Sequence, residues 1–100
     1  MEKRKPHYDI VAVRTYVARL GIGVFTKLAL DGGRSMGLTV DEMLAVIGTL
    51  TSANFYKSMT THADHRVWQD VYHAPTPVRK VAYIKITLRG SATVIQFKEK

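Results

Sequence analysis

Apolar residues recur three to four positions apart in the first half of the chain, which is the spacing of one face of an amphipathic helix. Such a pattern runs through residues 10–20, with Asp9 in front of it as an N-cap and Gly21 behind it as a stop. Another follows Thr39 and Glu42, whose spacing is that of a capping box, in which each side chain satisfies a free backbone N–H. Both stretches are therefore predicted to be helices.

Residues 26–36 have a similar apolar spacing but contain two glycines. Thr26 is placed to cap this helix and Gly37 to end it. Gly32 and Gly33 each cost a helix about 1 kcal/mol relative to alanine. The pattern predicts a second helix, which has a lower intrinsic propensity than the other two.

The pattern changes after Ser52, where aromatic, β-branched and hydroxyl residues predict strands. The predicted strands form two hairpins and cover residues 55–60, 67–72, 81–88 and 93–98. Proline is rare in central strands and a central glycine suits a tight turn, which predicts a linker at Ala74-Pro75-Thr76-Pro77 and a turn at Arg89-Gly90-Ser91. Helices followed by antiparallel strands indicate an α+β fold, with one antiparallel sheet packed against about three helices in a single domain, 1–100.

Alternation in the last hairpin separates a core face from an open face. Ala82, Ile84 and Ile86 point to one side, which the amphipathic helices must cover. Pairing them with the apolar residues of the partner strand leaves four polar side chains on the open face, Tyr83, Lys85, Gln96 and Lys98. Such a face can bind extended nucleic acid, but antiparallel sheets often have a face that is merely solvated, and alternation alone does not separate the two.

The charge is informative because the basic excess is local. The chain has 15 Lys or Arg and 8 Asp or Glu, for a net charge of +7. Residues 7–54 are balanced, whereas residues 55–100 hold eight basic and three acidic residues. A basic second half suits a nucleic acid or an acidic protein partner, and a basic domain without such a partner is the alternative.

The sequence argues against several classes of protein. Without cysteine it forms neither disulfides nor thiolate zinc sites. No run approaches the roughly 18 apolar residues of a membrane span, and no apolar segment follows the basic N-terminus, so we expect a cytoplasmic protein without membrane contact. His62, Asp64 and His65 fall in a predicted loop without a further ligand nearby and are interpreted as solvated. The chain has neither a phosphate-binding glycine loop nor a carboxylate cluster for Mg²⁺, so no cofactor is expected.

The richest stretch for chemistry is residues 54–73, which combines Lys57 and Gln69 with aromatic rings and hydroxyls. Basic groups bind phosphates, and flat rings stack on bases. Lysine, tyrosine and glutamine can also cleave RNA, because the 2′-hydroxyl is tethered beside the scissile phosphate and needs alignment, proton removal and charge stabilisation. A lysine crowded by other cations has a lowered pKa and suits proton removal. The simpler alternatives are a surface lysine at Lys57 and a core ring at Trp68, the only tryptophan.

Several sequence segments, taken together, resemble a known protein family. FYKSMTT, WQDVY, VAYIKIT and the closing FKEK, together with the opening MEKR and the Pro6-His7 pair, are similar to the MqsR toxins of bacterial type II toxin–antitoxin modules. The similarity spans essentially the whole chain and is closest at both ends and from Phe55 to Tyr72. The resemblance implies a RelE-like fold and an mRNA endoribonuclease that cuts GC-containing sites without metal or ribosome and inhibits translation and growth. It also implies a partner, a zinc-binding antitoxin of the MqsA type. The toxin would contact operator DNA only through this antitoxin.

The resemblance assigns functional residues as well. The family's catalytic positions in the FYK, WQDVY, VYLKIT-like and FKEK strings fall on Lys57, Gln69, Tyr83 and Lys98. We expect the two lysines to contact the scissile phosphate, the tyrosine to orient the 2′-hydroxyl or stack on a base, and the glutamine to hydrogen-bond the substrate. The expected substrate-binding residues are Tyr56, Lys85, Gln96 and His7, of which the histidine is also a candidate for proton transfer.

Two other functions stay open on charge and alternation alone. A non-catalytic RNA- or DNA-binding module would use the same basic sheet, and it predicts salt-sensitive binding without cleavage. A RelE-fold toxin that acts on a protein target predicts no effect on purified RNA. The resemblance is what favours cleavage over both.

Overall fold

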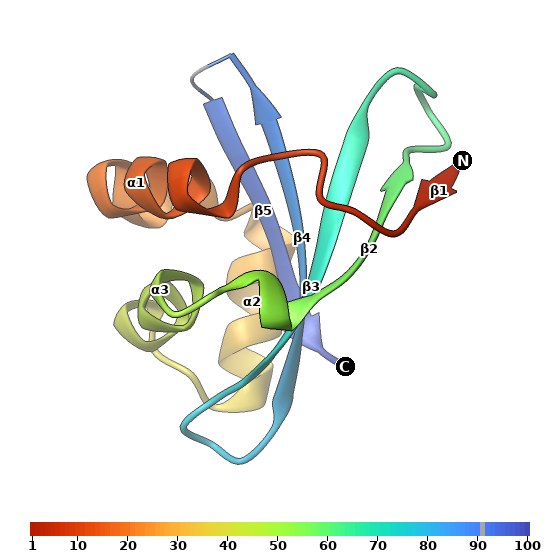
Figure 1. The fold of residues 1–100 in the computed structure, drawn as a ribbon. Coiled ribbons are helices and arrows are strands. Elements are labelled where there is room, and N and C mark those ends of the chain that lie inside the picture. Colours follow the sequence, from red (N-terminus) through yellow and green to blue (C-terminus); the bar gives the residue numbers. More distant parts are fainter. Residues whose placement is uncertain (91) are drawn as a thin grey trace.

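The computed structural model describes residues 1–90 and 92–100, and its three α-helices lie on one side of a single sheet (Figure 1). In chain order the elements, with η for a short 3-10 helix, are β1 (Glu2–Lys3), α1 (Ile10–Leu20), η1 (Gly21–Val24), α2 (Lys27–Met36), α3 (Val40–Gly48), η2 (Ser52–Asn54), β2 (Phe55–Thr60), β3 (Trp68–Pro75), β4 (Val81–Arg89) and β5 (Ala92–Glu99). The strands lie in the order β1-β2-β3-β4-β5, with every neighbouring pair antiparallel. This architecture confirms the predicted RelE-like α+β fold.

The helices begin and end where the capping residues predicted. Asp9 accepts a hydrogen bond from the N–H of Val11 at the start of α1, and Gly21 follows its end with φ 63°, a value that favours glycine. Thr39 and Glu42 form the predicted capping box at the start of α3. No helix in the described part of the chain is long and apolar enough to cross a membrane.

Helix α2 contains two glycines because it packs so closely on its neighbours that side chains at these positions would not fit. A Cβ at Gly32 would lie 2.2 Å from the carbonyl oxygen of Phe97 in β5. A Cβ at Gly33 would lie 2.2 Å from Sδ of Met43 in α3. The absence of these two side chains lets α2 lie directly against both neighbours, and this packing offsets the low helix propensity.

Three details of the sheet differ from the prediction or extend it. The prediction of a linker was wrong for Ala74 and Pro75, which belong to β3; the proline is tolerated because it is the last residue of the strand, paired with Val81. Strand β1 was not predicted, because two residues show no alternation. In the last hairpin Gly90 has φ 61°, whereas Ser91 of the predicted turn lies outside the described residues.

The hydrophobic core fills the space between the sheet and the helices. Ala82, Ile84, Ile86 and Ile95 are fully buried, which confirms the predicted alternation of the last hairpin. Burying each of the larger side chains stabilises the fold by about 1.5–3 kcal/mol. Trp68 is only half-buried and lies outside this core, so the interpretation of it as a core ring was wrong.

Candidate active site

The sheet face opposite the helices carries cross-strand rows in which all side chains but one are polar. The first row, from β2 to β5, is Lys57, Val71, Lys85 and Gln96. The second row, from β3 to β5, is His73, Tyr83 and Lys98. Directly opposed side chains in such rows have Cβ atoms about 4.5–5.5 Å apart, so the fold gathers these groups on one surface, which we call the basic face.

A β-bulge in β2 adds an aromatic ring to the basic face. The pairing advances two residues along β2, from Phe55 to Lys57, for one residue along β3. Tyr56 is the extra residue, and its 44% exposed side chain stacks on His73 with ring centroids 4.5 Å apart. Successive residues of a regular strand point to opposite sides, so the bulge is what allows Tyr56 and Lys57 to share one face.

Lys57 is paired with a carboxylate from the N-terminal strand. Its Nζ donates to Oε1 of Glu2 at 2.7 Å, and 21% of its side chain is exposed. Glu2 reaches Lys57 because it pairs with Met59 in the sheet, on the same side as the basic face. The hydrogen bond to Glu2 raises the pKa of Lys57, which keeps this lysine cationic.

Lys85 has the opposite electrostatic environment. It is half-buried and forms no ion pair with any residue that the structure describes. Burial, and after it the cations of Lys98 and Lys57, lowers the pKa of Lys85. The environments of these neighbouring lysines therefore shift their pKa values in opposite directions, upward for Lys57 and downward for Lys85.

The ring of Tyr83 lies among these basic groups. Nζ of Lys98 is 5.3 Å and Nζ of Lys85 is 5.9 Å from the ring centroid, both within reach of a cation–π attraction. His73 approaches the same ring from β3, with centroids 5.5 Å apart. Burial lowers the pKa of His73, which favours the neutral imidazole beside the lysines.

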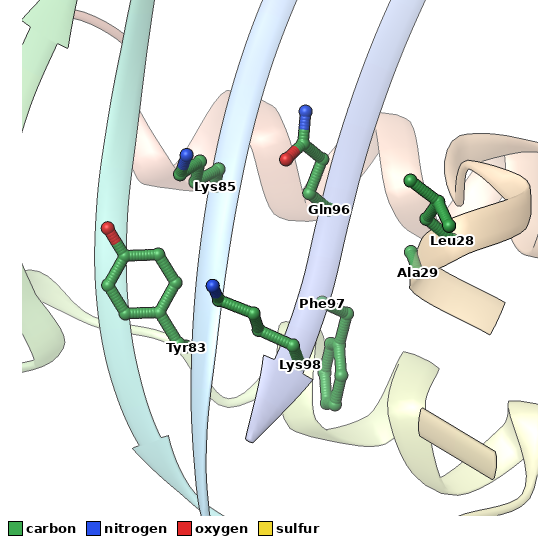
Figure 2. Close-up of a pocket in the computed structure, with 7 residues that line it drawn as sticks. All are labelled: Leu28, Ala29, Tyr83, Lys85, Gln96, Phe97 and Lys98. Carbon is green, nitrogen blue, oxygen red and sulfur yellow. The ribbon is translucent and has the colours of Figure 1, made fainter. Parts of the chain in front are cut away.

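Tyr83, Lys85 and Lys98 open onto a pocket of about 230 Å³ between β4, β5 and the start of α2 (Figure 2). The other lining residues are Leu28, Ala29, Gln96 and Phe97. Figure 2 shows the ammonium of Lys98 pointing towards the tyrosine ring and the amide of Gln96 standing beside Lys85. Cations and an aromatic ring around one opening suit a phosphate with a base attached to it.

Four of the predicted site residues, Lys57, Tyr56, Gln69 and His7, are not among those that line this pocket. Gln69 is half-buried and shares the basic face, two positions along β3 from Val71. His7 lies on the helix side of the sheet, where its ring stacks on Trp68 at 5.4 Å and its Nδ1 is 2.8 Å from Nζ of Lys3. The structure therefore brings the glutamine to the same face as the lysines but does not bring the histidine there.

Asp70 holds the segment that carries His7. Its side chain is fully buried and accepts hydrogen bonds from the backbone N–H of His7 at 3.0 and 2.9 Å and from that of Tyr8 at 2.8 Å. A buried carboxylate is stable only with such partners. This carboxylate thus fixes the path of the chain between β1 and α1.

On the basic face, sequence reasoning missed His73 and Glu2. The first has the same strand parity as Gln69, and this parity was a usable signal. The second gave no signal, because it is 55 positions from Lys57 and its strand was not predicted. Among the described residues no three His, Cys, Asp or Glu side chains gather as a metal site, and Asp64 instead pairs with Arg66.

Comparisons with known proteins agree with the resemblance seen in the sequence. A family model described as "Motility quorum-sensing regulator, toxin of MqsA" matches residues 5–99. A relative from Escherichia coli (strain K12), named "mRNA interferase toxin MqsR", is 43% identical over 100 residues, which cover 100% of this chain and 100% of the relative. The chain therefore belongs to the MqsR toxin family.

Proposed function

We propose that this protein is an endoribonuclease that cleaves mRNA as the toxin of a toxin–antitoxin pair. The observation that carries the proposal is the grouping of Lys57, Lys85 and Lys98 with Tyr83 on one sheet face, in two distinct electrostatic environments. The name of the E. coli relative supports the substrate, and the grouping supports the chemistry.

The proposed reaction is a phosphoryl transfer within the RNA. The 2′-oxygen attacks the adjacent phosphorus, the bond from phosphorus to the 5′-oxygen breaks, and the products are a 2′,3′-cyclic phosphate and a 5′-hydroxyl. A base takes the 2′-proton, and the departing oxygen gains one. Lys57 and Lys98 stabilise the extra negative charge at phosphorus, and losing one stabilising group of this kind costs about 10² to 10³ in rate. Tyr83 orients the 2′-hydroxyl or stacks on a flanking base.

Lys85 is the group that takes the 2′-proton. It lines the pocket beside Lys98, and no described carboxylate holds it in the charged form. A general base is most effective when its pKa is near the working pH, and the environment of Lys85 moves it in that direction. Gln69 hydrogen-bonds the substrate further along β3, and the exposed ring of Tyr56 stacks on a base.

This chemistry defines the wider function. It requires a 2′-hydroxyl, which restricts the substrate to RNA. We place the cuts at GC-containing sites in mRNA, without a ribosome, metal or cofactor, in the cytoplasm, so that translation and growth stop. The partner is a zinc-binding antitoxin of the MqsA type, which the description of the family as "toxin of MqsA" supports, and operator DNA is contacted only through that antitoxin.

The test is incubation of purified protein with a defined, protein-free mRNA in EDTA, followed by mapping of the cut ends. We expect cuts at GC-containing sites, each with a 2′,3′-cyclic phosphate and a 5′-hydroxyl. The control is a Lys57→Ala/Lys98→Ala double variant, shown to be folded by circular dichroism, which should leave the RNA intact.

Other results would favour the alternatives. Intact RNA that is bound in a salt-sensitive manner would favour a nucleic-acid-binding module. Intact RNA without binding would favour a protein target. An unchanged cut pattern in the folded double variant would show that the two lysines do not perform the chemistry.

A further inference from the structure

One wall of the pocket beside Tyr83 comes from a helix. Leu28, in the first turn of α2, lines the pocket on the other side of β5 from Tyr83, and Lys98 comes from β5 itself (Figure 2). Its side chain is 80% exposed, although it is large and apolar. Ligand sites combine apolar walls with a few polar groups that fix orientation, and Leu28 supplies such a wall next to the basic residues.

Backbone contacts hold Leu28 at this position. Phe25 forms an isolated parallel bridge with Ile95 of β5, and the N–H of Thr26 donates to the carbonyl of Ile95 at 3.2 Å. One turn further on, the missing side chain of Gly32 lets α2 touch the backbone of β5. The wall is therefore part of the rigid scaffold, which is what a specificity site requires.

We propose that this pocket holds one nucleobase of the RNA next to the scissile phosphate, with Leu28 packed on the base and Gln96 hydrogen-bonded to its edge. The inference rests on the proposed ribonuclease function and adds the recognition of one base to it. Leu28 is thus assigned as a specificity-determining residue, separate from the lysines that perform the chemistry.

The lining of the pocket fits a base attached to a phosphate. The cationic side chains, Lys85 and Lys98, surround Tyr83, where the phosphate is expected. The α2 side, Leu28 and Ala29, carries no charge. The amide of Gln96 has both donors and an acceptor, as base edges do.

The size of the pocket points to a single base. At about 230 Å³ it is smaller than the roughly 300–1,000 Å³ of sites for drug-sized ligands. A volume of this size leaves the neighbouring nucleotides outside the pocket. Recognition at this pocket is therefore expected to affect one position of the RNA and not its flanks.

An abasic scan tests the assignment without depending on cleavage. RNA oligonucleotides with 2′-O-methyl sugars, which cannot be cut by this reaction, carry one abasic nucleotide at successive positions, and their affinities are measured. We expect the abasic change at one position to weaken binding to the natural protein about 10-fold, the scale of one apolar contact in a pocket. In Leu28→Ala that penalty should fall to about 3-fold or less, with the penalties elsewhere unchanged.

Two variants serve as controls. Val11→Ala shortens an exposed apolar residue of α1 outside the pocket and should keep the natural pattern. Leu28→Met keeps an apolar side chain and should keep the position-specific penalty. An unchanged penalty in Leu28→Ala, or no position-specific penalty in the natural protein, would overturn the base pocket.

A parallel assay separates this inference from the function on which it rests. The natural protein is incubated with the same sequence carrying unmodified sugars. Intact RNA together with a Leu28-dependent abasic penalty would overturn the ribonuclease function while keeping the base pocket. Cleavage together with an abasic penalty that is the same in Leu28→Ala would overturn the pocket while keeping the ribonuclease function.

Discussion

Replacing Gly32 by alanine should destabilise the protein although alanine is the better helix former. Alanine gains about 1 kcal/mol over glycine within a helix. At this position, however, the new Cβ would lie 2.2 Å from the carbonyl oxygen of Phe97, a backbone atom that cannot rotate away. Forcing an extra carbon into a packed site costs about 1–3 kcal/mol, and contact between two backbones favours the upper end. We therefore expect Gly32→Ala to lower the free energy of unfolding by about 1–2 kcal/mol.

Two other helical glycines provide matched comparisons. Gly48 is at the end of α3, and a Cβ added there would meet nothing within 4 Å apart from its chain neighbours and the backbone of its own helix, so Gly48→Ala should stabilise the protein by up to about 1 kcal/mol. At Gly33 the nearest atom is Sδ of Met43, which belongs to a flexible side chain that can adjust. Gly33→Ala should therefore fall between the other two variants.

The three free energies are measured by equilibrium urea unfolding, followed by the fluorescence of the single tryptophan, Trp68. The expected order of stability is Gly48→Ala, then Gly33→Ala, then Gly32→Ala. A Gly32→Ala protein as stable as Gly48→Ala would refute the reasoning, because it would show that α2 does not need to touch β5.

Three further predictions follow from individual side chains. If Lys85 takes the 2′-proton, the cleavage rate rises with pH as the amine loses its proton, with a midpoint below the ordinary lysine pKa of 10.5. Lys85→Ala should remove this rise. An unaltered pH–rate profile in the variant would point to another base. Asp70→Asn should lower the free energy of unfolding by about 2–3 kcal/mol and loosen the segment before α1. Limited proteolysis should then cut this segment faster than in the natural protein. Unchanged protease resistance would contradict the anchoring role. Burial raises the pKa of Tyr72 to about 12, so the unfolded state ionises first and stability falls as the pH rises from about 10 to about 12. Tyr72→Phe should lose less stability between about pH 9 and about pH 11.5 in urea unfolding, whereas an equal loss would show that Tyr72 ionises normally.

Local patterns were enough to predict most of the fold. Capping residues located the helices, and alternation located the strands and oriented Tyr83, Lys85 and Lys98 on the face away from the core. These features depend on neighbours within a few positions, which a sequence displays directly. The same alternation predicted that Lys98 would share that face with Tyr83, and the register pairs the two residues directly.

Features that depend on contacts between distant segments were not predictable in this way. The bulge at Tyr56 is a mismatch between two strands and has no pattern within one of them. The glycines at positions 32 and 33 predicted a weak helix. The local sequence does not show why they are needed, because their packing partners, Phe97 and Met43, come from other elements. Part of the pocket was missed for the same reason, since Leu28 reaches it from a helix far away in the sequence.

The N-terminal strand contributes to the electrostatics of the site through one side chain, Glu2. Consecutive residues of β1 point to opposite sides of the sheet, so Lys3 covers Trp68 on the helix side while Glu2 pairs with Lys57 on the basic face. Glu2 holds Lys57 as a cation, and that cation in turn helps to lower the pKa of Lys85. The pKa of Lys85 is lowered first by burial and then by Lys98, so the strand of two residues at the edge of the sheet adds to this shift only through Lys57. Because that strand contributes no residue to the hydrophobic core, the electrostatics of the site can change without any rearrangement of the core.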